Sequence, residues 1–301
     1  MKRALLLMAV NLLVVITISF FLNVLGFRPY LSQRGIDYNS LLVFCAAFGF
    51  MGAFVSLQLS RFMAKKSMGV ELIDPDRPRN EAERLLVGTV RDLCRKAGIT
   101  TLPEIGVYPS REVNAFATGP SRDRALVAVS SGLFNAMDEQ GLIGVLGHEI
   151  SHVANGDMVT MTLLQGIVNT FVMFLARVGA LLIDGWMRGR DDERRGGGLG
   201  YYGQWMLISL LETVLMLFAA PLVAWFSRRR EFRADQGSAD MLGTQTMIHS
   251  LEQLRRSQRV DTSHALVGAF KINGGQPGLL ARLFSSHPPL DARIEALRRR
   301  A

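Results

Sequence analysis

The chain has 301 residues, of which 49% are hydrophobic and 20% are charged, and it carries a net charge of +8. With a mean hydropathy of +0.21 it is too apolar for an ordinary soluble protein, so we expect membrane segments joined to a water-facing part. Its basic residues gather just outside apolar runs, which suits anionic lipid head groups and argues against a nucleic-acid-binding protein. Its two cysteines lie in an apolar run and in a helical pattern, which excludes a disulfide framework.

Two long apolar runs open the chain. Residues 4–25 follow a basic start, as in a secretory signal, but the run is long for one and no small-residue cleavage pattern follows. Residues 41–63 are also long enough to cross a bilayer, so the two runs predict a transmembrane hairpin. Basic residues, including Lys65 and Lys66, follow the second run. Both ends of the hairpin are therefore expected to face the cytoplasm.

The next segment, residues 69–157, has the pattern of a water-facing region with helices and strands. Apolar residues three and four apart predict a helix over residues 80–97, which Gly98 ends. A second helix is predicted to begin near Asp138. Short apolar stretches bounded by turn residues predict three strands, over residues 105–108, 114–118 and 125–129.

Two further apolar runs, residues 158–183 and 206–226, are each long enough to span a membrane. The first contains Arg177 and the second Glu212, and an ionisable residue in a bilayer is costly unless it is paired or faces a cavity. A loop rich in glycine and charge joins the runs, and its arginines count against a crossing. The choice between a spanning hairpin and no crossing is left open here. The remaining chain is predicted to be helical over residues 234–254 and 290–299.

The string from His148 to His152 reads His-Glu-Ile-Ser-His and carries the chemistry. Four residues apart on a helix, the two histidines lie one turn apart on one face, so both can bind one zinc ion. Glu149 lies beside them and can accept the proton of a water molecule that the metal activates. This pattern is typical of zinc peptidases and is rare by chance in a chain with five histidines.

A catalytic zinc site requires a third protein ligand. No histidine follows His152 at the short spacing that one zincin class uses. Glu231 offers a ligand from a later helix, and Asp235, four residues on, would hydrogen-bond a ligand histidine and fix its tautomer. The alternative for both acids is an ordinary solvated face after a membrane helix. To share one metal, His152 and Glu231 must lie on one side of the membrane, so the chain between them crosses it an even number of times.

Other candidate residues have two interpretations each. His287 either donates a hydrogen bond to the oxyanion of the reaction or is a structural histidine in a turn. Arg293 either pairs with a carboxylate of the site or is an ordinary surface residue of a helix. Asn114, Ala115 and Phe116 form either an edge strand that a peptide substrate extends through backbone hydrogen bonds, or a plain strand of a small sheet.

Together these motifs resemble the HtpX family of membrane-bound bacterial zinc endopeptidases, relatives of the CAAX prenyl endopeptidases. The resemblance runs essentially end to end. It rests on the two N-terminal apolar runs, Asn114-Ala115-Phe116-Ala117, Gly147-His148-Glu149, Glu231-Phe232-Arg233-Ala234-Asp235 and Ser286-His287-Pro288-Pro289. It implies Glu231 as the third zinc ligand and favours substrate binding at Asn114. Ser285-Ser286 stands where the family commonly has Ser-Thr, which is a mild change.

The predicted fold is α-rich α+β: a zincin-like metalloprotease domain with a small β-sheet, plus transmembrane helices. The domain has two parts, residues 67–157 and 228–301, with two apolar helices between them over 158–227 and the membrane hairpin over 1–66. One Zn²⁺ per chain is expected. The resemblance implies a multi-pass protein of the bacterial cytoplasmic (inner) membrane whose catalytic domain faces the cytoplasm. It would cleave misfolded or damaged membrane proteins, in quality control and the stress response.

Two rival functions are weighed against this one. The first is a processing peptidase that cuts one kind of partner, such as lipidated peptides. The second is a membrane scaffold or regulator with a vestigial metal site. Degenerate peptidases usually lack the base or a ligand, whereas Glu149 and all three expected ligands are present here.

Overall fold

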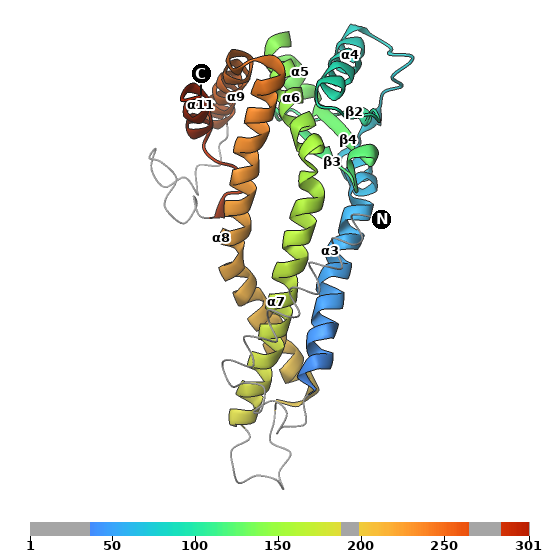
Figure 1. Cartoon of the computed structure of the whole chain (residues 1–301). Helices are drawn as coiled ribbons and strands as arrows, with labels where there is room; N and C mark the ends of the chain where they lie inside the picture. Colours follow the sequence, from blue (N-terminus) through green and yellow to red (C-terminus); the bar gives the residue numbers. More distant parts are fainter. Residues whose placement is uncertain (1–36, 188–198, 265–283, 301) are drawn as a thin grey trace. The chain divides into compact units, whose positions relative to one another are not determined.

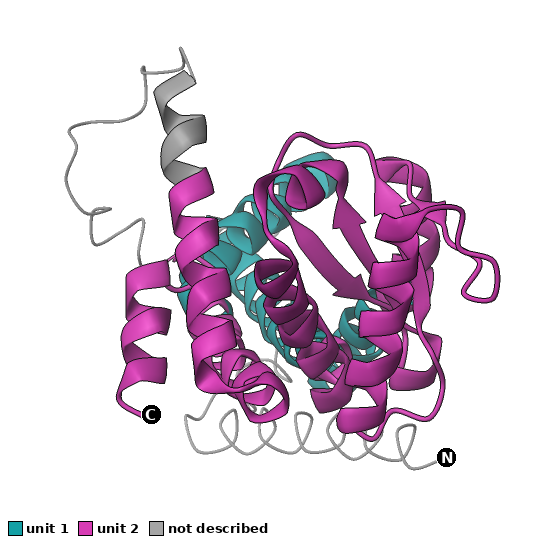
Figure 2. Ribbon diagram, turned by 90° about the horizontal axis from the view of Figure 1, so that it is seen from above, with its two compact units in different colours: residues 1–55, 161–223 teal, residues 56–160, 224–301 magenta. Residues whose placement is uncertain are grey.

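The computed structural model describes residues 37–187, 199–264 and 284–300 and is mainly helical, with one small sheet (Figure 1). This confirms the α-rich α+β class. The chain divides into two compact units, the first made of residues 1–55 and 161–223 and the second of residues 56–160 and 224–301 (Figure 2). The predicted helix over residues 4–25 lies outside the described residues, as does most of the charged loop.

Three long helices, α3 (Tyr38–Met68), α7 (Asp157–Met187) and α8 (Gly200–Leu242), dominate Figure 1. Each is long and apolar enough to cross a membrane. Large apolar side chains stay exposed on them, including Phe218 at 77% exposure. Exposure of such side chains to water costs free energy, whereas exposure to lipid does not. These helices therefore suit a bilayer.

Within the first unit, α3 and α7 pack closely. Leu42 and Cys45 of α3 share a buried cluster with Phe174 of α7. The backbones approach at Gly49, where an added Cβ would stand 2.7 Å from Thr170 Oγ1. Small residues at such crossings allow the close contact on which helix association in membranes depends.

The two ionisable residues of the apolar runs pair with each other. Arg177 Nη1 of α7 donates to Glu212 Oε1 of α8 at 2.7 Å. The same nitrogen reaches the backbone oxygen of Met173 at 3.1 Å, and the guanidinium lies 5.6 Å from the ring centroid of Phe44. An unpaired ionisable residue would be costly in a bilayer, and because Arg177 is paired, α7 is compatible with a membrane helix.

The second unit contains a four-stranded sheet. Its strands are β1 (Glu71–Leu72), β2 (Glu104–Tyr108), β3 (Ala115–Thr118) and β4 (Leu126–Ser130), in the order β1-β2-β4-β3. Strands β2 and β4 are parallel, and the other two pairings are antiparallel. Within the described sheet, β3 therefore pairs with β4 alone and forms an edge. The three predicted strands are confirmed. β1 was missed because two residues carry no periodic pattern.

The helices that begin in this unit are α4 (Glu81–Lys96), α5 (Ser131–Ala136), α6 (Glu139–Asn155), α9 (Thr244–His264) and α11 (Leu290–Arg298), with a 3-10 turn at Arg122–Arg124. Helix α6 contacts β3, α4 and α9, and α11 packs on α9. As predicted, Gly98 adopts a left-handed conformation (φ 66°) just beyond α4. Leu86 of α4 and Ile150 of α6 lie in the core shared with the sheet. In Figure 2 the C-terminal helix lies at one margin of this unit.

The prediction of a single helix over residues 234–254 is wrong. The segment is two helices, because α8 ends at Leu242, Gly243 adopts φ 89°, and α9 begins at Thr244. A single glycine inside a helical pattern is often tolerated, so the pattern did not predict the turn. By contrast, the apolar run 206–226 continues without a break into the segment that carries Glu231, because both belong to α8.

Candidate metal centre

Helix α6 carries the two histidines and is fixed at both ends. At its start the Asp138 side chain accepts a hydrogen bond from the Gly141 amide at 2.8 Å, and His249 Nε2 of α9 donates to the same carboxylate at 2.9 Å. At its end Gly156 adopts φ 69° and turns the chain into α7. Between these caps, His148 and His152 lie one turn apart, with their Nε2 atoms 3.1 Å from each other.

Close packing brings α8 against α6. A Cβ added at Gly147 would stand 2.5 Å from Ser238 Oγ, so only glycine allows this approach. Ser238 Oγ also donates to the backbone oxygen of Gly144 at 3.0 Å. This contact places Glu231, two turns before Ser238 on α8, opposite the histidines.

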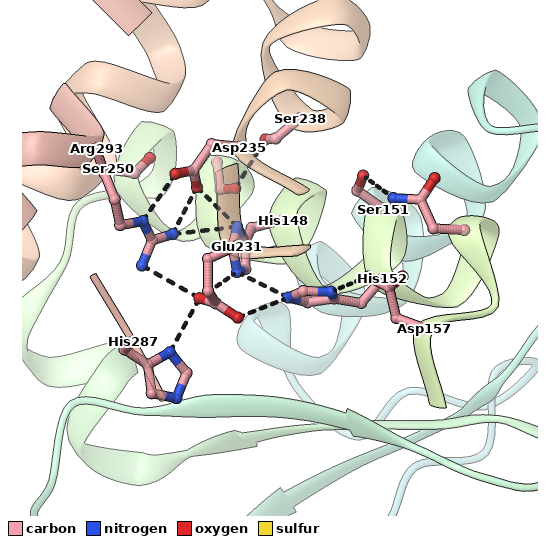
Figure 3. Close-up of polar contacts among 12 residues, drawn as sticks. His148, Ser151, His152, Asp157, Glu231, Asp235, Ser238, Ser250, His287 and Arg293 are labelled. Atoms are coloured by element: carbon pink, nitrogen blue, oxygen red, sulfur yellow. Dashed lines mark hydrogen bonds and ion pairs between the residues drawn. The ribbon is translucent and has the colours of Figure 1, made fainter. Parts of the chain in front are cut away.

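Glu231 completes a cluster of three side chains that could hold a metal ion (Figure 3). Its Oε2 lies 3.5 Å from His148 Nε2 and its Oε1 lies 3.3 Å from His152 Nε2. Ligand atoms of a tetrahedral zinc site, each about 2.0–2.2 Å from the ion, stand about 3.3 Å apart. The donor set and its spacing therefore fit a divalent metal. The structure brings together all three residues that the sequence predicted as ligands.

Asp235 orients His148. His148 Nδ1–H donates to Asp235 Oδ1 at 2.9 Å, which leaves Nε2 free to bind a metal. Arg293 of α11 donates from Nε to Asp235 Oδ2 at 2.7 Å, and its own side chain is buried. Burial alone would raise the pKa of Asp235, but the hydrogen bonds from Arg293 and His148 outweigh it and lower that pKa. Asp235 thus contacts a histidine of the cluster, and Arg293 contacts a carboxylate beside it.

Asp157 orients His152, and the sequence did not predict this contact. Its Oδ2 accepts a hydrogen bond from His152 Nδ1 at 2.6 Å (Figure 3). The carboxylate is buried, and Arg230 Nη1 donates to the backbone oxygen of the same residue at 3.1 Å. Each histidine of the cluster therefore has a carboxylate partner of its own, the arrangement that favours metal binding through Nε2.

Glu149 lies on α6 beside the cluster and next to the edge strand. Burial raises its pKa above the ordinary value, against the opposing effect of His148 and His152. The backbone amide of Ala117, on β3, hydrogen-bonds the carboxylate and also works against this rise. A carboxyl group with a raised pKa near an open cavity suits proton transfer.

A cavity of about 320 Å³ opens over the cluster. Glu149, Glu231, His287, Asn114 and Ala115 all line it. His287 is 69% exposed, and its Nδ1–H donates to Glu231 Oε2 at 3.0 Å. Of the three predicted substrate-binding residues, Phe116 does not line the cavity; its ring lies 5.5 Å from that of Tyr108.

Comparisons with known proteins agree with this geometry. The model for peptidase family M48 matches residues 80–301. A protease HtpX homolog of Methylacidiphilum infernorum is 48% identical and covers 99% of this chain and 98% of its own length. Protease HtpX of Chromohalobacter salexigens is also 48% identical, and the match covers 100% of this chain and 99% of that protein. In the crystal structure of S. mikatae Ste24p the match has a TM-score of 0.59 at 18% identity, over 99% of this chain and 66% of that one, a likeness of fold alone.

Proposed function

This chain belongs to peptidase family M48 and is a membrane metalloprotease, and we propose that it cleaves misfolded or damaged membrane proteins with one zinc ion held by His148, His152 and Glu231. The observation that carries the proposal is the convergence of these three side chains beside Glu149, under a cavity bordered by an edge strand. Imidazole and carboxylate ligands suit zinc, which supports it over the harder cations.

Glu149 is proposed as the general base and acid. When bound, zinc supplies Lewis acidity, which lowers the pKa of a water molecule and polarises a carbonyl group. Glu149 accepts the proton of the attacking water and passes it to the leaving amine. Its raised pKa supports both steps, because the carboxyl group must hold the proton between them. No covalent bond between enzyme and substrate is required.

His287 is proposed to stabilise the oxyanion that forms at the attacked carbonyl. It lies at the exposed side of the cavity, and one ring nitrogen contacts Glu231. In its imidazolium form the ring would donate through Nδ1–H to Glu231 and through Nε2–H towards the substrate, where a donor is most effective if aimed at the developing charge. We also propose that Asp235, Asp157 and Arg293 position the ligands and do not touch the substrate.

The edge strand β3 is proposed to bind the substrate as an added strand. Its outer edge makes no pairing within the described sheet, and Asn114 and Ala115 line the cavity. Backbone hydrogen bonds to an extended peptide carry little sequence selectivity. Such binding requires an unfolded segment, which supports damaged or misfolded polypeptides as the substrate class.

The catalytic domain, residues 67–157 and 228–301, is proposed to face the cytoplasm of a bacterial inner membrane. Helix α7 begins just after the site and α8 returns to it, so two crossings keep all ligands on one side. Basic residues stand where α3 and α8 leave their apolar runs, at Arg61, Lys65 and Lys66 and at Arg228, Arg229 and Arg230. This placement supports the orientation under the positive-inside rule.

The proposal is tested with protein purified in detergent with a chelator present. Zinc is added, and cleavage is followed for several unrelated unfolded proteins, for a membrane protein in native and destabilised forms, and for the chain itself. Glu149→Gln is the test variant. Glu139→Gln, an exposed acid in the first turn of the same helix, is the matched control.

We expect zinc to start cleavage in the wild type and the control, whereas Glu149→Gln binds zinc and stays inert. Destabilised membrane protein should be cut faster than its native form. If the wild type binds zinc and cleaves nothing, the proposal fails and the scaffold hypothesis takes its place. Cleavage of one substrate alone would favour a processing peptidase.

A further inference from the structure

A second cavity, of about 550 Å³, continues the one that holds the catalytic groups. The two share Val113 as a lining residue. Their walls also continue along the chain, because Leu133 lines the first and Gly132 the second, while Leu254 lines the first and Gln253 the second. The two cavities therefore form one trough between the segment before β3, helix α5 and helix α9.

Two arginines line this second cavity. Arg111 comes from the segment before β3 and Arg256 from α9. The other lining residues that the structure describes are polar or small, and none of them is acidic. Within the described part of the chain, neither guanidinium has a carboxylate partner, whereas the neighbouring Arg255 pairs with Asp291 at 2.6 Å. The cavity thus carries two positive charges that the described protein does not neutralise.

The cavity lies at a fixed distance from the reacting groups. Ala117 marks the catalytic point of β3, because its amide contacts Glu149. Val113 lies four residues before Ala117 and two before the start of β3, so at the rise of an extended strand it is at most about 13 Å away. An extended peptide beside β3 would therefore place in this cavity a residue three or four positions from the bond that is cut.

We propose that this cavity is a substrate subsite that selects a carboxylate three or four residues from the scissile bond. The carboxylate belongs to the part of the bound peptide that lies beside the N-terminal end of β3. The inference rests on the proposed function and adds a substrate preference to it. Arginine forks bind carboxylates through two parallel hydrogen bonds, which gives geometric selection as well as charge. The carboxylate comes either from an aspartate or glutamate side chain or from the end of the substrate chain.

The test uses full-length protein in detergent with zinc and a set of quenched fluorescent peptides with amidated ends. Glutamate, glutamine or lysine stands three or four residues from the scissile bond, on either side. A further peptide has glutamine there and ends at that position with a free carboxylate, which separates the two sources. The variants are Arg111→Gln/Arg256→Gln, the charge reversal Arg111→Glu/Arg256→Glu, and Arg255→Gln as the matched control.

In the wild type we expect kcat/KM to be about three- to tenfold higher for the glutamate peptide than for the glutamine peptide, and lower still for lysine. The ratio should fall to about one in Arg111→Gln/Arg256→Gln, reverse towards lysine in the charge reversal, and persist in Arg255→Gln. A preference for the free end alone assigns the site to chain termini. Equal cleavage of all peptides by the wild type overturns the subsite while the peptidase stands. No cleavage of any peptide means that the proposed function fails, and the subsite with it.

Discussion

The Oδ2 atom of Asp157 lies 2.6 Å from Nδ1 of His152 (Figure 3). The contact depends on Gly156, whose left-handed conformation ends α6 and turns the next residue back towards the helix. It gives His152 a buried carboxylate partner that matches the one Asp235 provides for His148. The candidate metal site therefore consists of two histidine–carboxylate pairs facing one glutamate.

Replacement of Asp157 should weaken metal binding without removing a ligand. In Asp157→Asn the partner of His152 loses its charge, so the imidazole becomes less basic and its tautomer is less strictly held. We expect zinc affinity to fall by about 10- to 100-fold, measured by competition with a chelator. Asp240→Asn, an exposed acid on α8, should leave the affinity unchanged. An unchanged affinity in Asp157→Asn would mean that the carboxylate only supports the turn between α6 and α7.

Zinc affinity should rise with pH up to about 9 and then level off. Burial alone would lower the pKa of His152, but the carboxylates of Asp157 and Glu231 outweigh it and raise that pKa to about 9 in the metal-free protein. A binding metal must displace this proton. Affinity should therefore increase about tenfold per pH unit for each proton displaced.

The same proton stabilises the metal-free fold, with the opposite dependence on pH. Since the folded pKa of His152 lies above its ordinary value of 6.5, its contribution is complete below pH 6.5 and is lost as pH rises through about 9. Thermal unfolding in detergent, at intervals across this window, should show the Tm of the metal-free protein falling. The difference between zinc-loaded and metal-free Tm should widen; a constant difference would contradict the assignment.

The close contact between α6 and α8 should set the shape of the metal site. In Gly147→Ala the new Cβ would stand 2.5 Å from Ser238 Oγ and 2.7 Å from Leu242 Cδ1. Such overpacking costs about 1–3 kcal/mol and pushes Glu231 away from the histidines, so both Tm and zinc affinity should fall. Adding Ser238→Gly should restore part of both.

The control is Gly88→Ala on α4, where an added Cβ meets nothing within 4 Å. Alanine is the better helix former by roughly 0.5–1 kcal/mol, so this variant should be slightly more stable and bind zinc as the wild type does. If Gly147→Ala lowers Tm but leaves zinc affinity intact, the packing contact stabilises the fold without shaping the site.

The site residues that the sequence alone could relate to one another are those whose geometry is local. His148, Glu149 and His152 share one helix, and a spacing of four residues is enough to put both imidazoles on one face. Glu231 is distant in sequence, so spacing left its role open and the family resemblance was required. Asp157 was missed because its position depends on the backbone turn at Gly156, and an Asn-Gly-Asp string otherwise indicates only a loop.

The fold shows the same division. The strands and α4 follow from periodicity and caps, whereas the break at Gly243 depends on how α9 packs back against α6. Sequence patterns also could not show that Arg177 and Glu212, 35 residues apart, meet on neighbouring helices. That pairing follows from the side-by-side packing of α7 and α8 in the first unit, which no local rule contains.

Breaking the ion pair between Arg177 and Glu212 should lower the free energy of unfolding of the membrane helices. Their atoms lie 2.7 Å apart, and the side chains are 24% and 33% exposed to what would be lipid. In Arg177→Met, Glu212 loses its partner in an apolar environment. We expect a loss of about 2–4 kcal/mol, below the full cost of breaking a buried pair because both groups are partly exposed.

Glu212→Leu should cost a similar amount, since it leaves the guanidinium unpaired, while Arg177→Met/Glu212→Leu should be nearly as stable as the wild type. The two single changes and the double change form a cycle, measured by reversible unfolding in mixed micelles. The exposed pair Arg84 and Glu81 on α4 is the matched control, with a coupling below about 1 kcal/mol. If the double variant is no more stable than either single variant, the two residues do not stabilise the membrane helices as a pair, and each acts through separate contacts, such as that of Arg177 with Phe44.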